Sequence, residues 1–417
     1  MKNTFYKKKS IFLIIFSFLS TLSISAEKVE AYYSGFSFIA NSGNLPKLFP
    51  YTYEISKMKE EGSSQSLLDA AARKTVIDNQ PDKFSLNILG ENVNQKASLA
   101  KGQSIVCSIA MDNETVSIEH IDDFHRVVIF LSAQILFFDF NEKSIIGSFP
   151  FRLQFQDVIT DGDPRENEGA RIKSLVEDLI INKDKFGLSL MDEFSKRIKN
   201  LELKEKYKSR IQVANVIVEE KSLHALPKRY SENSYAFKRF LGQSFSTLLS
   251  SNQDISVLPF VLTGDENTEN NISKAGGAIG GRMTTTFANG DAYNLTIPEA
   301  DFTIDFTLRG YKKVLIEEKA AGSSWVYGTY SKVKVYESLM NKVYFDEKIK
   351  NGFSTIIPAS QRDTDHWQYF QESTLVLMDQ LTKQFSKQEK SWAKKHGSGS
   401  KTLKQLKKTY KILEKCK

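Results

Sequence analysis

Hydrophobic and polar residues alternate along two long stretches of the chain, and this alternation predicts β-strands with one buried face. Sheets of this pattern usually pack one face against helices. The positions that share a face are Ile129, Leu131, Ala133, Ile135 and Phe137 in the first stretch, and Phe302, Ile304, Phe306 and Leu308 in the second. Each half of the chain is therefore expected to contain a β-sheet.

The elements around each stretch occur in the same order. An opening strand is expected at residues 33–40 and again at 213–218, each followed by a helix at 64–74 or 235–249. Short apolar strands are expected next, at 84–89 and 255–262. Each half ends in an amphipathic helix, whose apolar stripe is Ile172, Leu175, Val176, Leu179 and Ile180 in the first half and Trp367, Phe370, Leu377, Leu381 and Phe385 in the second.

Short segments also match between the halves at a constant offset. Val116-Ser117-Ile118-Glu119 corresponds to Val314-Leu315-Ile316-Glu317, and Ile135, Phe137 and Ile145 correspond to Val333, Val335 and Val343. We interpret the match as a tandem duplication. The alternative is that two unrelated α+β domains share only a coarse pattern.

The predicted fold class is α+β, with two tandem related domains that each form a mixed β-sheet with helices packed on one face. The first domain is expected at residues 27–191 and the second at 211–386. A charged helical linker at 192–210 joins them, and a basic tail follows at 387–417. The second domain differs by an insertion rich in Gly, Asn, Thr and Asp at 263–290.

Residues 1–26 have the three parts of a secretory signal peptide. Four lysines lie among the first nine residues, and an apolar segment at 11–22 follows, too short for a stable membrane span. Small residues then allow cleavage after Ser25 or Ala26. We expect a periplasmic or secreted protein, with an uncleaved signal anchor as the alternative. No later stretch reaches the roughly 18 uninterrupted apolar residues of a membrane span.

The formal net charge of +7 is unevenly distributed. The signal segment contributes four lysines and residues 387–417 contribute a net +9, so residues 27–386 carry −6. A body that is mildly acidic argues against nucleic-acid binding. Only two cysteines are present, Cys107 and Cys416, which excludes a small disulfide scaffold.

Within the basic tail, an apolar seam at helical spacing is formed by Leu403, Leu406, Tyr410 and Leu413, with lysines at the other positions. A cationic helix of this kind is able to bind an anionic membrane surface or an acidic partner. A disordered terminus and docking back on the acidic body are the alternatives.

The second half resembles the CsgG/LpoB/TolB-amino-terminal class of bacterial envelope domains. The resemblance rests on the strand Ile255-Ser256-Val257-Leu258-Pro259-Phe260 and on the strand start Ala300-Asp301-Phe302-Thr303-Ile304, followed by a meander and a closing helix. It implies protein–protein work in the envelope, such as secretion assembly or activation of wall synthases. The chain departs from this class in lacking a lipid-anchor cysteine and an obvious pore-forming hairpin set.

No motif for a hydrolase, zinc protease, P-loop or dithiol site is present, and no catalytic, cofactor-binding or metal-binding residue is predicted. Asp161 and Asp163 supply oxygen ligands as in a calcium loop, but a helix start explains them better. The glycines of 276–282 fit a turn-rich loop. His120 and His125 have poor spacing for a shared metal, and Cys107 fits a core strand position.

The sequence therefore predicts an exported, non-enzymatic protein that acts through a protein partner or the cell envelope, without cofactors. The alternative is a secreted enzyme or released effector of unrecognised type, with Asp161, Asp163 and the glycine loop as its best site. A polar pocket shared by the halves would favour the enzyme, and exposed apolar patches would favour the binding protein.

Overall fold

The computed structural model describes residues 28–417 except positions 61, 63, 90–103, 122, 232–233, 262–280 and 360–365. The predicted signal peptide lies outside the described residues, and so does most of the glycine-rich segment. In the part that is described, no helix combines the length and the hydropathy needed to cross a bilayer.

The first sheet begins with a parallel pair and continues as an antiparallel meander. Its strands from the first half are β1 (Glu30–Phe38), β2 (Ser85–Ile88), β3 (Ile105–Ile121), β4 (Phe124–Asp139) and β5 (Ser144–Ile159). β1 pairs in parallel with β2 and β3, and β3, β4 and β5 follow one another as hairpins. The long alternating stretch predicted around residues 129–137 is β4.

The second sheet repeats this arrangement. It consists of β6 (Ile211–Val218), β9 (Phe302–Lys319), β10 (Gly322–Glu337) and β11 (Val343–Pro358), in the order β11-β10-β9-β6. β6 is parallel to β9, as β1 is to β3, and β9, β10 and β11 form a second meander. The predicted α+β class with two related sheets is confirmed.

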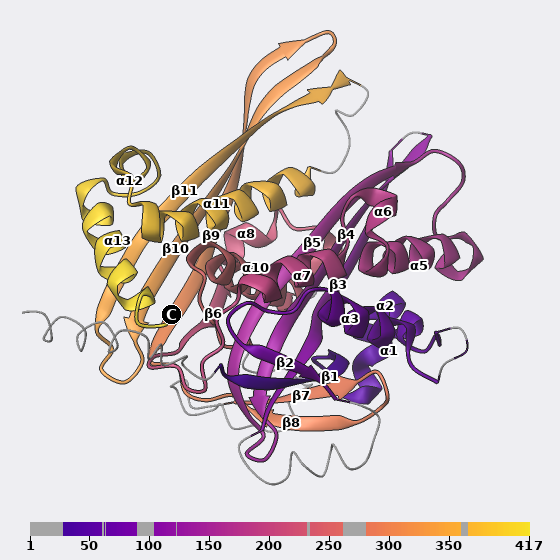
Figure 1. The fold of residues 1–417 in the computed structure, drawn as a ribbon. Helices are drawn as coiled ribbons and strands as arrows, with labels where there is room; N and C mark the ends of the chain where they lie inside the picture. The colour runs from indigo at the N-terminus through magenta and orange to yellow at the C-terminus, as the bar shows by residue number, and fades with distance from the viewer. Residues whose placement is uncertain are drawn as a thin grey trace, which may run out of the picture.

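Helices form a layer on one face of each sheet (Figure 1). α3 (Leu67–Asp78), α5 (Glu166–Ile181) and α7 (Leu190–Asn200) enclose the first core. α10 (Ser234–Gln253) packs on β6 of the second sheet and also on β5 of the first, while α11 (Trp367–Lys387) packs on α10, β10 and β11. Shorter helices are η1 (Ser42–Asn44), α1 (Leu45–Leu48), α2 (Pro50–Ser56), α6 (Lys183–Phe186), α8 (Glu220–Leu223), α9 (Lys228–Ser231), α12 (Lys390–His396) and α13 (Ser400–Leu413).

The two halves share their strand irregularities as well as their strand order. Each half has one extra residue in its opening strand, one in the first meander strand and one near the start of the third. Bulges of this kind bend a strand and are retained within a fold family. The extra residues are Ser34, Asp112 and Ile146 in the first half and Ala214, Arg309 and Tyr344 in the second.

The second half also contributes to the first sheet. β7 (Arg282–Phe287) and β8 (Ala292–Thr296) form a hairpin that continues the first sheet beyond β5. β7 pairs in addition with the end of β1, and the Thr286 hydroxyl donates to the carbonyl of Ala40 at 2.7 Å. The strand predicted at 255–262 is reduced to a single bridge between Leu258 and Gln212.

The segment predicted as a linker belongs to the first core along much of its length. α7 occupies its beginning, where Phe194 and Ile198 are fully buried. Leu201, Leu203 and Tyr207 continue the same core in extended chain. The connection between the halves is therefore packed, and Arg197 at its centre donates to the carbonyl of Ser250 in α10 at 2.9 Å.

Candidate interaction surfaces

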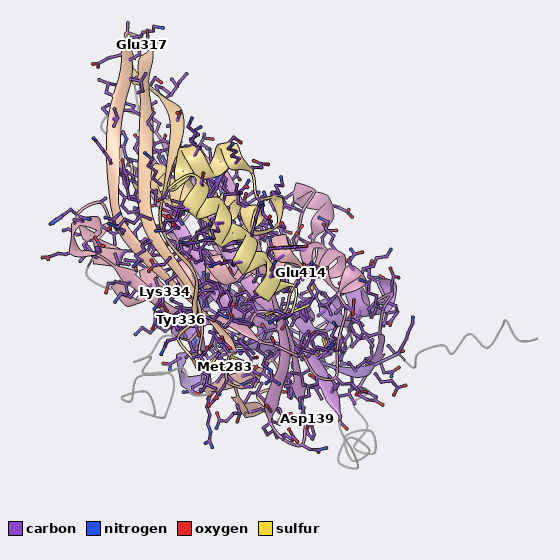
Figure 2. The ribbon with its side chains drawn as sticks, turned by 90° about the vertical axis from the view of Figure 1, so that its left-hand side faces the viewer. Asp139, Met283, Glu317, Lys334, Tyr336 and Glu414 are labelled. Atoms are coloured by element: carbon purple, nitrogen blue, oxygen red, sulfur yellow. The ribbon has the colours of Figure 1, made fainter. Side chains whose placement is uncertain are left out.

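Three strands of the second sheet project beyond the body of the molecule (Figures 1 and 2). β6 pairs with β9 only as far as Leu308, and α11 begins at Trp367 near the same level. β9, β10 and β11 continue past this point as a three-stranded ribbon, with Glu317 near its tip. We call this ribbon, residues 311–326 and 351–358, the arm.

The arm carries exposed apolar side chains on both of its faces. Ile316 is 63% exposed and Ile356 is 74% exposed, and Val314 and Leu315 are 39% and 42% exposed. Val314 and Leu315 are consecutive in β9, so their side chains point to opposite faces. Ile316 is the extra residue of a further bulge, between Leu315 and Glu317, for which the first half has no equivalent. Several exposed apolar side chains gathered on one projecting ribbon are a feature of interaction sites.

A cluster of aromatic and basic residues fixes the base of the arm to the first turn of α11. The Lys313 ammonium lies 3.9 Å from the centre of the Trp325 ring and 3.3 Å from His366 Nε2. His366 Nδ1 is hydrogen-bonded to the Tyr327 hydroxyl. Burial lowers the pKa of Lys313 and raises that of Tyr327. This cluster was not predicted from the sequence, because its members come from three separate elements and form no local motif.

The basic tail is docked on the body, which was one of its three predicted alternatives. Leu406 and Leu413 of the predicted seam are fully buried, with Leu403 partly buried. Glu347 of β11, only 2% exposed, accepts from Thr402 Oγ1 at 3.2 Å and Gln405 Nε2 at 2.9 Å, and pairs with Lys401 Nζ at 3.0 Å. The other lysines of α13 remain exposed.

The tail also covers part of a sheet edge. β11 is the last strand of its sheet, and Gln405 Oε1 accepts from the backbone N–H of Asp346 at 2.6 Å. His396 Nδ1 lies 2.9 Å from the carbonyl of Lys350. Exposed edge strands are sites for pairing with another chain, and proteins usually cover them. Among the described residues, none pairs with the outer edge of β11 along the arm.

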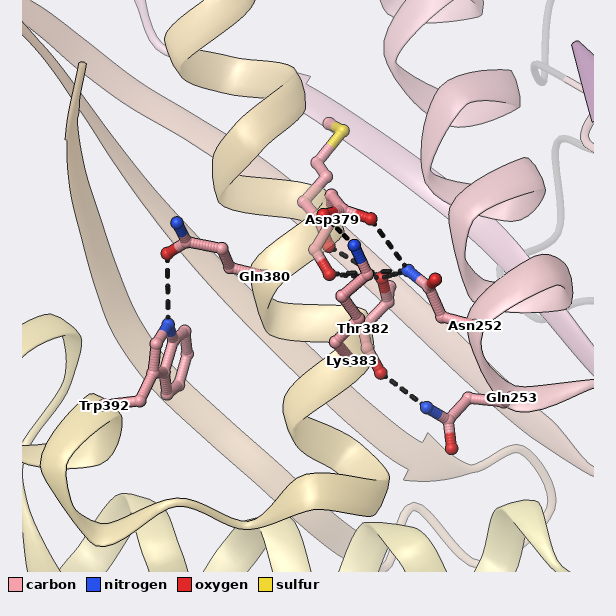
Figure 3. A network of polar contacts seen from close by, with 8 residues as sticks. Asn252, Gln253, Asp379, Gln380, Thr382, Lys383 and Trp392 are labelled. Atoms are coloured by element: carbon pink, nitrogen blue, oxygen red, sulfur yellow. Dashed lines mark hydrogen bonds and ion pairs between the residues drawn. The ribbon is translucent and has the colours of Figure 1, made fainter. Parts of the chain in front are cut away.

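Hydrogen bonds join α11 to α10 on one side and to α12 of the tail on the other (Figure 3). At the end of α10, Asn252 Nδ2 donates to Thr382 Oγ1 at 2.8 Å, and Gln253 Nε2 donates to the Thr382 carbonyl at 2.6 Å. On the far side of α11, Trp392 Nε1 of α12 donates to Gln380 Oε1 at 3.2 Å. α11 is thus joined to α10 on one side and to the tail on the other.

The acidic residues that sequence analysis singled out are paired with arginines. Asp161 contacts Arg171 at 2.9 Å and Asp163 contacts Arg165 at 2.6 Å, and these arginines lower the pKa of both carboxyl groups. α5 begins three residues after Asp163, but its N-cap residue is Arg165 and no side chain caps it, while Asn167, Glu168 and Gly169 have left-handed backbone angles. The acids therefore precede an irregular helix start, and Asp163 does not cap it. Among the described residues, no group of three or more His, Cys, Asp and Glu has the geometry to hold a metal.

The two histidines whose spacing was judged poor for a shared metal are in contact with each other. His120 and His125 are partners across the β3–β4 hairpin, with His120 Nδ1 3.2 Å from His125 Nε2. Asp163 Oδ2 lies 4.0 Å from His125. The five-residue spacing is explained by the tight turn, a hairpin geometry that brings positions on opposite sides of a turn face to face.

Cys107 and Cys416 are both free and buried. Cys107 shares its strand face with Ile105, Ile109 and Met111, all buried, and burial raises the pKa of its thiol well above the ordinary value. Burial raises the pKa of Cys416 to about 12. Neither thiol is activated for nucleophilic chemistry, because the thiolate is the reactive form.

A cavity of about 330 Å³ lies between the first sheet and the β7–β8 hairpin. Phe36, Phe138 and Phe287 line it, and Asp69 lies at its polar edge. Both carboxylate oxygens of Asp69 are occupied, by the N–H of Phe36 at 3.0 Å, Gln65 Nε2 at 2.8 Å and Arg73 Nε at 3.0 Å. Gly35 permits this approach, because a Cβ there would lie 2.6 Å from Asp69 Oδ1.

Comparison with known proteins gives only distant structural similarity. No family model and no curated protein matches this chain. A putative neuraminyllactose-binding hemagglutinin homolog from Helicobacter pylori is 14% identical, with a TM-score of 0.24 over 43% of this chain and 87% of that one. The hypothetical protein CT253 from Chlamydia trachomatis is 11% identical, with a TM-score of 0.21 over 42% of this chain and 96% of that one. TM-scores this low carry no functional argument.

Proposed function

We propose that this chain is an exported, non-enzymatic protein of the cell envelope that binds a partner protein through the arm. The observation that carries this proposal is the exposed apolar surface on both faces of the arm, at Val314, Leu315, Ile316 and Ile356. Export is supported by the three-part pattern of residues 1–26. A role in envelope assembly is supported by the resemblance of the second half to the CsgG/LpoB/TolB-amino-terminal class.

The geometry of the arm favours a protein over a membrane as its occupant. Val314 and Leu315 point to opposite faces of the ribbon, and a protein partner is able to make apolar contacts with both faces. Glu317 near the tip is already paired with Lys319 Nζ at 3.0 Å. The open outer edge of β11 offers such a partner backbone hydrogen bonds by strand addition.

The test is site-specific photo-crosslinking in the full-length exported chain. Ile316 or Ile356 is replaced by benzoylphenylalanine, and Leu339 serves as the matched control. Leu339 is 92% exposed and lies in the turn between β10 and β11, at the opposite end of the same meander. We expect one discrete adduct with a different envelope protein from positions 316 and 356, and none from position 339.

The proposal fails if the adducts at 316 and 356 contain only lipid or only a second copy of this chain. It also fails if position 339 gives the same adduct with the same yield. An Ile316→Asp/Ile356→Asp variant that still folds should lose the partner in reciprocal purification, whereas Leu339→Asp should retain it. Thermal melting of each variant confirms that the fold is intact.

A further inference from the structure

A cleft of about 330 Å³ lies between the two halves, away from the arm tip. One wall is a face of the first sheet, where cross-strand partners from β3, β4 and β5 stand in three rows. The rows are Glu119–Arg126, Ser117–Val128–Gln156 and Thr115–Phe130–Gln154. The other wall is the first turns of α11 together with Phe353 of β11.

Carboxamides are the most frequent polar groups in this cleft. Gln154 and Gln156 line one wall, and Gln368 and Gln371 line the other. In the part of the chain that the structure describes, none of these four side-chain carboxamides has a hydrogen-bond partner. Each carboxamide has two donor hydrogens and an acceptor oxygen. Gln371 is only 8% exposed, and leaving polar atoms unpaired at such a position costs free energy unless water or a ligand satisfies them.

Aromatic rings supply the apolar part of the lining. Phe130 comes from the first sheet, Phe353 from β11 and Tyr369 from α11. Tyr369 also packs against Tyr327 with ring centres 5.0 Å apart, so its position is fixed by the cluster at the base of the arm. Aromatic rings of fixed position, beside carboxamides that both donate and accept hydrogen bonds, suit a ligand with apolar faces and hydroxyl groups at its edges.

The ionic groups disfavour an anionic ligand. Arg126 is paired with Glu119, and Glu372 is a second carboxylate on the opposite wall. Arg152 of β5 interacts electrostatically with Glu372 but does not line the cleft. The lining thus has one arginine, already paired, and two glutamates, so the cleft itself has a negative balance.

We propose that this cleft binds a short neutral oligosaccharide. Sugar hydroxyls both donate and accept, which matches the four carboxamides, and the apolar faces of sugar rings stack on Phe353 or Tyr369. A peptide fits less well, since peptide recognition by strand addition needs a free strand edge and this wall is a sheet face whose backbone groups are already paired. The cleft lies at the base of the arm, to which Phe353 belongs, and its ligand is distinct from the partner protein proposed for the arm tip.

The experiment is isothermal titration of the full-length exported protein with maltotriose, lactose and triacetylchitotriose, with trigalacturonate as the acidic comparison. We expect at least one neutral sugar to bind with a dissociation constant below about 1 mM. Trigalacturonate should bind at least tenfold more weakly. Gln154→Ala/Gln156→Ala, two exposed positions that leave the fold unchanged, should weaken binding at least tenfold.

The matched control is Gln80→Ala, which removes an exposed glutamine at the end of α3, outside the cleft. It should leave sugar binding unchanged. The proposal is overturned if no neutral sugar binds at about 10 mM, a concentration corresponding to a free energy weaker than roughly −3 kcal/mol. It is also overturned if the double variant binds as tightly as the original chain, or if a mixture of extended octapeptides competes for the cleft and the sugars do not.

Discussion

The two meanders have the same strand order, two equivalent bulges and matching residues, yet their far ends differ in what covers them. In the first meander, Val116 and Ile118 pack against the core, and Phe155 of β5 contacts Phe186 of α6 with ring centres 4.8 Å apart. In the second, the corresponding Val314 and Ile316 lie in the arm and are exposed. The same apolar pattern is a core in one half and a surface in the other.

The difference lies in the helices that follow each meander. After β5, the chain forms α5 and α6 against the end of the first sheet. After β11, α11 runs instead over the lower part of β10 and β11 and toward α10. Its first turns contact Tyr311 at the base of the arm, and no described helix covers the arm beyond this point. The two halves thus share a strand pattern, but only the second leaves part of it uncovered, and this difference supports the proposal that the arm binds a partner.

The largest contrast should come from placing a charge at equivalent positions. We expect Ile118→Asp to lower the free energy of unfolding by about 2–4 kcal/mol, because a carboxylate enters a packed site without a partner. Ile316→Asp should change it by no more than about 0.5 kcal/mol, because the site is already in water. Urea denaturation measures both. Equal losses would show that the arm is packed in solution.

A smaller effect is expected where the first meander meets α10. Asp112 is buried at the bulge of β3; its Oδ2 accepts from Gln134 Nε2 at 2.7 Å, and its Oδ1 is buried with no hydrogen-bond partner. Burial raises the pKa of this carboxyl to about 6. The native state therefore holds a proton that the unfolded chain releases near pH 4, so stability falls as the pH rises from about 4 to 6.

Asp112→Asn should remove this contribution and stabilise the protein at pH 7 by about 1–3 kcal/mol. The Asp112 carbonyl, which accepts from Arg239 Nη2 at 2.6 Å and Gln243 Nε2 at 3.0 Å, is unaffected by the change. Unfolding is measured from pH 4 to 7 for both chains. If the two pH profiles are parallel, Asp112 is ionised in the native state throughout.

The smallest effect is expected at the tail that covers the base of the second meander. Lys401→Ala removes the ion pair to Glu347, but the lysine is 66% exposed and the glutamate keeps Thr402 and Gln405. The loss in stability should be about 0.5 kcal/mol or less. Cys416, buried at the end of the tail, should stay as slow to react with a maleimide as Cys107. Faster labelling of Cys416 alone would show that the ion pair holds the tail down.

The sequence was sufficient to predict the fold class and the long strands such as β4 and β9, since alternation reflects burial of one face. The strand predicted at 255–262 was wrong, and the β7–β8 hairpin was not predicted. It did not reveal the bulges, because an extra residue such as Asp112 interrupts a ladder only in relation to its partner strand. It also did not distinguish Ile118 from Ile316, because both follow the same local pattern and only the tertiary cover differs.

The interaction surfaces were harder to predict for a related reason. The cleft draws its carboxamides from β5 and α11, more than 200 residues apart, and the cluster at the base of the arm joins Lys313, Tyr327 and His366 from three elements. None of these residues lies in a local motif. The apolar seam of the tail was predicted from the sequence, but the surface of the body on which it packs was not.

The hairpin of β7 and β8 has a consequence for how the chain is made. Ala40, at the end of the first strand, receives its hydrogen bond from Thr286, a residue 246 positions later. At roughly 5–20 residues per second, a ribosome takes about 12–50 s to synthesise that interval. Throughout this time the end of β1 lacks its partner strand β7. It therefore completes its native pairing only after most of the chain exists.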